Sequence, residues 1–347
     1  MLANVQKDIK MESKSLGYTY NYAVSKFLNE FNNKNYVSLN YPSMGCNGSS
    51  SDYNFIDSML GSIGEVFERQ SLTNFWEAQV PPKVMTCLNI NKKRTERIKF
   101  NKQMLSYLYD TCGLSTYTST EGAFENSLSE FIERQSFILS YLSKSPGFFL
   151  KKDDLFKELV PKRLQFMNLY EISFIRFYKV IFGIGAKKEN EIYIGLGAGY
   201  TMEDALHSFV KEANPFETGK NEDLKKIKYL DYSDIFSILA RDKILAAYDY
   251  LKESPIVKID DINSYRHNRS QVLDELTNYM KSNLYMTSFF SKNNKYFRNK
   301  SAKSIKIFCL NWFPSLDPSS FNDETYEYVE RVTGKGLNRR INFIPFP

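Results

Sequence analysis

Histidine and cysteine are scarce in this sequence, and the shortage limits the metal sites and disulfides that the chain can form. Among 347 residues there are two histidines and four cysteines, at Cys46, Cys87, Cys112 and Cys309. No two cysteines form a Cys-x-x-Cys pair, so the sequence predicts neither a zinc site nor a disulfide framework. Two histidines are also too few for a histidine-based metal centre.

Long apolar runs are absent as well. Nowhere does the sequence contain the ~18 consecutive apolar residues that a membrane-spanning helix requires. The N-terminal stretch MLANVQKDIKMESK has no apolar core, so no signal peptide is indicated. From these absences we expect a cytoplasmic protein that does not associate with a membrane.

The familiar motifs for nucleotides and nucleic acids are missing too. The sequence has no Gly-x-x-x-x-Gly-Lys-Ser/Thr, and the stretch GLGAG at residues 195–199 does not fit Gly-x-Gly-x-x-Gly. That glycine cluster favours a tight turn over a phosphate cradle. With 46 basic against 40 acidic residues the net charge is a modest +6. The basic runs at 91–99 and 291–306 are typical of solvated surfaces, so no nucleic-acid partner is expected.

The composition and periodicity that remain are those of a globular α/β or α+β protein, with 42% hydrophobic and 25% charged residues. Apolar periodicity predicts helices around residues 62–71 and 127–136, and at 155–170, 201–213, 233–252 and 270–285. Strands are predicted at 174–185, 191–197 and 304–313, and loops at 40–51 and 214–223. The length allows one large domain or two ordinary ones, and no low-complexity linker divides the chain, so helices lying on a sheet are expected.

One polar pattern occurs twice. The stretches SIGEVFERQS from Ser62 and SLSEFIERQS from Ser127 share Ser-x-x-Glu-x-x-Glu-Arg-Gln-Ser and begin 65 residues apart. On a helix, positions i, i+3, i+4 and i+7 share a face. The first octet therefore presents a polar stripe of Ser62, Glu65, Glu68 and Arg69. The second repeats it with Ser127, Glu130, Glu133 and Arg134.

Two interpretations of these octets are open. They can be amphipathic surface helices, each supported by Glu–Arg i,i+4 pairs worth about 0.2–0.5 kcal/mol. Surface helices have no physical need to repeat four polar positions, however, and the repetition favours a functional interpretation. In that interpretation the four glutamates hold Mg²⁺, which prefers oxygen ligands, and Mg²⁺ bridges the phosphates of a nucleotide. Arg69 and Arg134 would neutralise those phosphates.

A third segment, GLGAGYTMEDALHSFVKEA at residues 195–213, is a weaker echo of the octets. Aligning Glu212 with Glu65 and Glu130 also aligns Ala205 with Ala123 and Ser58. Three related helix-bearing units predict an internally repeated architecture with one composite site.

Taken in order, these three blocks resemble the motif blocks of the YcaO family, from about Asn47 to the end of the chain. The second block and the ending NFIPFP are most similar to the cyclodehydratase subunit of a microcin B-type azole synthetase. The resemblance implies one YcaO domain over 1–347, with an N-terminal arm at 1–45, repeated core blocks at 46–330 and a tail at 331–347. It also implies ATP and Mg²⁺ bound in one composite site among the repeated helices.

The activity implied by the resemblance is ATP-dependent ring formation in a ribosomally made precursor peptide. A Cys, Ser or Thr side chain adds to the preceding amide carbonyl, ATP phosphorylates the resulting oxygen, and phosphate leaves. The products are a thiazoline or oxazoline, ADP and inorganic phosphate. Relatives form thioamides or other backbone modifications, and a catalytically silent scaffold subunit is a further alternative.

Site residues follow from the resemblance by position. The first motif matches Ser62, Glu65, Glu68 and Arg69, the second Glu130, Glu133 and Arg134, and the third Glu212. Glu65, Glu68, Glu130 and Glu133 are the expected metal ligands. Pro347, ending a proline-rich tail, is the expected catalytic residue, because the family's chain terminus helps proton transfer. The sequence departs from the family at Gln135 in the second block, and at Pro215 and Asn221, which follow the third block.

Partners are implied in the same way. We expect a separate leader-binding (E1-like, RRE) subunit, because the chain has little length for a fused one, and an FMN-dependent azoline dehydrogenase.

Overall fold

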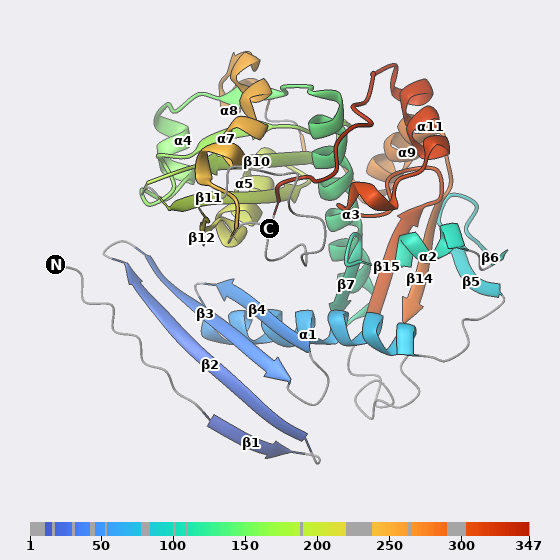
Figure 1. Ribbon diagram of the computed structural model, residues 1–347, viewed down its shortest axis with the longest axis horizontal. Coiled ribbons are helices and arrows are strands. Elements are labelled where there is room, and N and C mark those ends of the chain that lie inside the picture. The colour runs from blue at the N-terminus through green and yellow to red at the C-terminus, as the bar shows by residue number, and fades with distance from the viewer. Residues whose placement is uncertain are drawn as a thin grey trace. The chain divides into compact units, whose positions relative to one another are not determined.

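The computed structural model describes residues 11–15, 18–29, 32–41, 46–52, 54–77, 84–99, 102–108, 110–187, 190–219, 238–262, 265–289 and 303–346. The chain divides into two compact units. Unit 1 comprises Met1–Phe131 and Asn283–Leu310, and unit 2 comprises Ile132–Ser282 and Asn311–Pro347. Both units mix helices with β-sheet, as the fold-class prediction states (Figure 1).

Unit 1 begins with an antiparallel sheet in the order β1 (Met11–Ser15), β2 (Tyr18–Asn29), β3 (Asn32–Tyr41) and β4 (Cys46–Asp52). Helix α1 (Phe55–Glu77) packs on β3 and β4 (Figure 1). A Cβ atom added to Gly48 would collide with the backbone of α1 at Ser62. The predicted loop at 40–51 is therefore wrong over β4, because its small residues let a helix lie close to the strand.

The second sheet of unit 1 has the order β6 (Arg94–Lys99), β5 (Val84–Asn89), β14 (Leu284–Phe289), β15 (Lys303–Cys309) and β7 (Leu114–Tyr117). All four pairs of neighbouring strands are antiparallel. Helix α1 also packs against β7, β14 and β15, and α2 (Lys102–Leu108) lies beside them in the core. The core includes Leu72, Met104, Leu108, Leu114 and Phe308.

Helix α3 (Thr120–Ser143) follows β7 directly and carries the chain from unit 1 into unit 2. Unit 2 has one sheet, in the order β12 (Asn214–Glu217), β11 (Glu191–Gly199), β10 (Lys179–Gly185), β9 (Asn168–Glu171), β8 (Phe148–Leu150) and β13 (Ile256–Val257). Its described helices are α4 (Asp154–Leu159), α5 (Met202–Glu212), α7 (Arg241–Ala247), α8 (Ile259–Ile262), α9 (Arg269–Met280) and α11 (Asp323–Thr333).

The stretch GLGAG lies inside strand β11 and is not the tight turn that its composition suggested. Helix α5 packs on this strand. A Cβ atom on Gly197 would collide with the backbone of α5 at Ala205 and Phe209. The glycines are therefore needed for close packing of helix on sheet.

The internal repeat is a structural one. A strand leads within a few residues into a helix three times, as β4–α1, β7–α3 and β11–α5. The small residues that the sequence aligned, Ser58, Ala123 and Ala205, are all fully buried. Repeated helix-on-sheet units are thus confirmed, and the small residue is explained by the space between helix and sheet.

Element boundaries differ from the periodicity in several places. The predicted helix at 155–170 ends at Leu159, and the chain turns before it enters β9. The helix predicted to reach 285 ends at Met280, where Lys281 adopts a left-handed conformation before β14. The predicted strand at 174–185 begins only at Lys179. The predicted loop at 214–223 is wrong over β12. Residues 233–237 of one predicted helix lie outside the described residues.

Within the described part of the chain, no helix combines the length and apolar character needed to cross a membrane.

The close approach of α5 to β11 can be tested by adding one methyl group. We expect Gly197→Ala to destabilise the protein by about 1–3 kcal/mol, because the overpacked helix must shift. The measurement is the urea unfolding midpoint. Gly336→Ala is the matched control, since no atom lies within 4 Å of the added Cβ. An equal effect of both variants would contradict this account.

Candidate functional site

The first octet occupies the middle of α1 and is only partly a polar stripe. Ser62 is fully buried, and its hydroxyl donates to the carbonyl of Ser58 at 3.0 Å. Glu65 and Arg69 are partly exposed, with 27% and 44% of their side-chain surfaces accessible. A guanidinium nitrogen of Arg69 lies 2.6 Å from Oε1 of Glu65, one helical turn away. The octet therefore presents a Glu–Arg pair to solvent and turns its serine inward.

Glu68 is the carboxyl group of this octet whose pKa is shifted by its surroundings. The backbone N–H of Thr116, on strand β7, donates to Oε1 of Glu68 at 2.7 Å. Burial, followed by the charge of Glu130, raises the pKa of Glu68 well above its usual range, and Glu65 adds to this effect. The Thr116 bond and Arg69 oppose the shift without reversing it. The fold therefore holds a carboxyl group where a negative charge is unfavourable unless a cation is near.

The coupling of Glu68 to Glu130 brings the two octets together inside unit 1. Glu130 lies on α3, one turn after Ser127. The hydroxyl of Ser127 is fully buried and donates to the carbonyl of Ile305 on strand β15 at 2.8 Å. The serines at the start of the two octets thus share burial but bond to different partners.

The end of the second octet lies in unit 2, beside the C-terminal tail. Glu133 is buried, and its Oε1 is 3.9 Å from Nε of Arg134. The guanidinium carbon of Arg134 lies 4.8 Å from the ring centroid of Phe346. The Phe346 ring also packs on Phe137, with centroids 4.9 Å apart, and the hydroxyl of Tyr248 donates to the carbonyl of the preceding proline.

Two tail residues at this position, Ile344 and Phe346, are buried. The sequence signalled this docking only through its proline-rich ending and gave no sign of the Tyr248 contact. Pro347 itself lies outside the described residues, so its expected catalytic role stays a prediction.

The trailing Gln-Ser of the octets has a structural explanation. The side-chain amide of Gln135 is buried and donates to the carbonyl of Phe313 at 2.8 Å. Ser71 and Ser136 each donate to the carbonyl four residues earlier on their own helix. The serine repeats because both helices bury this position.

The third block contributes Glu212, the last residue of α5, which is exposed. Pro215 lies in β12 and is the register partner of Tyr193 on β11. A proline is tolerated there because β12 is an edge strand of its sheet. Asn221 lies outside the described residues.

Comparison with known proteins identifies the fold. No protein-family model and no curated protein matches the sequence. A chain of the E. coli microcin synthetase McbBCD complex matches 98% of this chain and 100% of its own length, with a TM-score of 0.66 and 17% identity. The same complex with pro-MccB17 bound matches with a TM-score of 0.64, 17% identity and the same coverage.

A third solved structure is YcaO from Methanopyrus kandleri, bound with AMPPCP and Mg²⁺. It matches 87% of this chain and 85% of its own, with a TM-score of 0.55 and 13% identity. The chain has the YcaO fold. The resemblance seen in the motif blocks is thereby confirmed at the level of architecture.

Within this YcaO fold the carboxylates can be assessed as metal ligands. Among the described residues, no three His, Cys, Asp or Glu side chains are grouped closely enough to hold a metal ion. Mg²⁺ that binds with a nucleotide requires only one or two carboxylates, because phosphate oxygens and water complete its shell. The like-charged pair of Glu68 and Glu130 fits that requirement. The larger set that adds Glu65 and Glu133 stays a prediction.

Removing one charge from this pair should stabilise the metal-free YcaO fold. Glu68→Gln keeps an acceptor for the Thr116 N–H and abolishes the repulsion from Glu130. We expect an increase of about 1 kcal/mol in stability, or roughly 2 °C in Tm, without metal or nucleotide at pH 7. Glu158→Gln, at an exposed position, is the control and should change little. A Tm lowered by Glu68→Gln alone would contradict the electrostatic assignment.

Proposed function

We propose that this chain is the ATP-dependent cyclodehydratase subunit of a peptide-modifying complex, forming thiazoline or oxazoline rings at Cys, Ser or Thr. The observation that carries the proposal is the proximity of Glu68 and Glu130, one from each repeated octet, at which the charge of Glu130 raises the pKa of Glu68. Further support comes from the near-complete match to a chain of a microcin synthetase complex, whose second structure contains the bound peptide pro-MccB17.

The proposed reaction consumes one ATP for each ring. The substrate's thiol or hydroxyl bonds to the preceding amide carbon, and its proton passes to solvent or a nearby base. The oxygen of that adduct attacks the γ-phosphorus of ATP, and ADP departs. The carbon–oxygen bond then breaks, inorganic phosphate leaves, and the amide nitrogen loses its proton to give the ring.

Glu68 and Glu130 are proposed to hold Mg²⁺ that is shared with the phosphates of ATP. When bound, the ion would supply positive charge beside the phosphates during phosphoryl transfer. The M. kandleri YcaO structure, which contains AMPPCP and Mg²⁺, supports ATP and Mg²⁺ as the bound pair. Glu65 adds negative charge beside Glu68 and is proposed to orient Arg69 through their 2.6 Å contact.

The two arginines are proposed to bind phosphate oxygens. The Arg69 side chain is 44% exposed, so a phosphate can approach it. Arg134 is held between Glu133 and Phe346 and is only 16% exposed. A guanidinium that is held in one orientation loses less entropy when it binds an anion. Glu133 and Glu212 are proposed to contact the nucleotide as predicted, whereas the buried hydroxyl of Ser62 bonds to Ser58 and its predicted nucleotide contact stays a prediction.

The C-terminal tail is proposed to form part of the site. Phe346 fixes the tail against Arg134 and Phe137. Pro347 follows it, and its expected part in proton transfer remains in the proposal. A precursor peptide, a leader-binding subunit and an FMN-dependent dehydrogenase are the proposed partners, with multisubunit relatives of the same fold in support.

The proposed function can be tested by reconstitution with a leader-binding subunit, a precursor peptide, Mg²⁺ and ATP. We expect the peptide to lose the mass of one water per ring while one equivalent of phosphate appears. Glu130→Gln should abolish Mg²⁺-dependent ATP hydrolysis without unfolding the protein, because one of the two carboxylates of the pair is lost. Glu125→Gln, on another face of α3, is the control.

Each result of this assay bears on a stated alternative. A peptide that gains sulfur in exchange for oxygen would indicate a thioamide-forming enzyme. Absence of ATP turnover with every partner present would indicate a scaffold subunit. Full activity of Glu130→Gln would refute the metal assignment.

The contact between Phe346 and Arg134 gives a separate prediction. Phe346→Leu retains apolar volume but removes the aromatic face beneath the guanidinium. We expect kcat for cyclisation to fall by about 5–10-fold, the equivalent of a cation–π contact of about 1 kcal/mol. Phe346→Tyr should retain most of the rate. Equal rates for wild type and Phe346→Leu would show that the ring does not position Arg134.

A further inference from the structure

Strand β15 contains three consecutive residues, Ser304, Ile305 and Lys306, that form hydrogen bonds near the two octets. Their partners lie on α1, on α3 and on the turn and strand β7 that precede α3. The side chains of Ser304 and Lys306 are almost fully buried, at 1% and 0% exposure. The sequence here, SIKIFCLNWF, indicated only a strand. Buried polar side chains on a central strand are costly unless they are hydrogen-bonded, so their partners are informative.

Ser304 connects to Glu68 through Thr116. The hydroxyl oxygen of Ser304 lies 2.6 Å from that of Thr116, and 3.3 Å from that of Ser71 on α1. Thr116 also donates its backbone N–H to Glu68 at 2.7 Å. A continuous set of polar contacts therefore runs from β15, through β7, to the carboxylate on α1.

Ile305 acts on the second octet through its backbone. Its carbonyl accepts the hydroxyl proton of Ser127, three residues before Glu130 on α3. Strand β15 thus contacts Thr116 through Ser304 and contacts α3 through the next residue, Ile305. This short segment is therefore linked by hydrogen bonds both to Glu68, through Thr116, and to the helix that carries Glu130.

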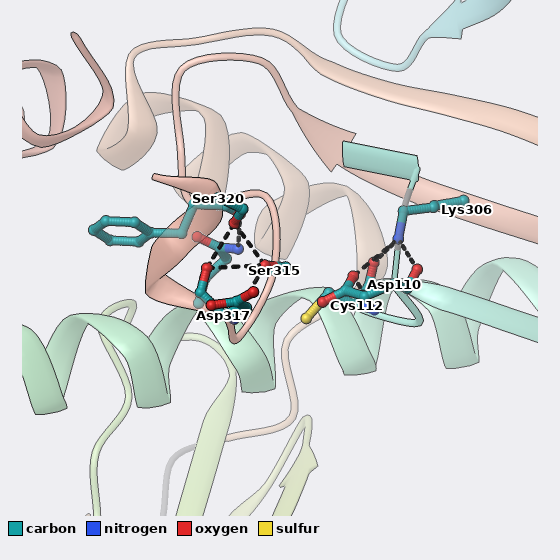
Figure 2. A network of polar contacts seen from close by, with 8 residues as sticks. Asp110, Cys112, Lys306, Ser315, Asp317 and Ser320 are labelled. Carbon is teal, nitrogen blue, oxygen red and sulfur yellow. Dashed lines mark hydrogen bonds and ion pairs between the residues drawn. The ribbon is translucent and has the colours of Figure 1, made fainter. Parts of the chain in front are cut away.

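Lys306 fixes the turn that leads into β7 (Figure 2). Its Nζ donates to the carbonyls of Asp110 and Cys112, each at 2.7 Å, and lies 3.5 Å from the Asp110 carboxylate. Gly113 follows with a positive φ of 68°, and its carbonyl accepts the N–H of Ile307 at 2.8 Å. The start of β7 is therefore held on both sides, which fixes the place of Thr116.

We propose that Ser304 is a positioning residue for the Glu68–Glu130 pair and that it acts through the hydroxyl and backbone N–H of Thr116. The proposal rests on the proposed function, since it concerns how that pair receives a metal–nucleotide complex. Mutation of a group that orients a metal ligand from behind typically lowers metal affinity by 10–100-fold. Ser304 touches no substrate in this account.

The test compares Ser304→Ala with Ser304→Thr, which keeps the hydroxyl on a side chain suited to a strand. Mn²⁺ binding is titrated by electron paramagnetic resonance in the presence of a non-hydrolysable ATP analogue, and no turnover is required. We expect Ser304→Ala to weaken Mn²⁺ binding by about 10-fold or more. Ser304→Thr should restore most of the affinity, and analogue binding without metal should change little.

Two further variants separate positioning from stability. Ser136→Ala removes an equally buried hydroxyl that bonds only within α3 as far as the described contacts show, and should not change Mn²⁺ affinity. Thr116→Val keeps the backbone N–H at Glu68 but breaks the link to Ser304, and should reproduce the effect of Ser304→Ala. The Tm without metal shows whether Ser304→Ala folds. If it does not, Thr116→Val alone tests whether Ser304 positions Glu68.

The outcomes distinguish the two proposals. If wild type binds Mn²⁺ with the analogue and Thr116→Val and folded Ser304→Ala bind it equally well, positioning by Ser304 is overturned and the proposed function stands. If wild type binds no Mn²⁺ with the analogue, the proposed function fails and the positioning proposal fails with it.

Discussion

The bond from the Thr116 N–H to Glu68 is the constraint on which the candidate site depends. It draws a carboxylate of α1 down to strand β7, out of water and towards Glu130. Burial and the nearby charge of Glu130 both disfavour the ionised carboxylate and raise the pKa of Glu68. Such an arrangement persists because the surrounding contacts hold it, and a bound cation would reverse its cost.

Helix α1 packs against β7, where that bond forms, and close packing of helices on strands recurs in the fold. At Gly48 and Gly197 the strand has no room for a side chain, since the helix backbone lies directly above it. A strand leads into a helix in three units, with small buried residues at Ser58, Ala123 and Ala205, and this close packing is seen in the first and third of them. A repeated architecture therefore explains why the octets share a sequence pattern, including the buried serines that follow each Glu-Arg-Gln.

Residues that are identical in the two octets have different surroundings in the structure. Ser62 bonds to its own helix, whereas Ser127 bonds to a neighbouring strand. Arg69 is paired with a glutamate one turn away at the surface, whereas Arg134 lies against the aromatic ring of the C-terminal tail. The repeat thus supplies one scaffold on which the two arginines have become different, one accessible and one held in place.

The sequence by itself determined the two octet helices, the helix predicted at 201–213 and the mixed α/β class, because apolar period and motif spacing are local properties of the chain. It misjudged GLGAG, since glycine marks both turns and close packing, and only the partner helix distinguishes them. Only the tertiary structure singled out Glu68 and Glu130 among the four predicted glutamates, placed Phe346 on Arg134 and revealed Ser304 behind Thr116. Those contacts join residues far apart in sequence, and no local pattern encodes which distant strand or tail a side chain will meet.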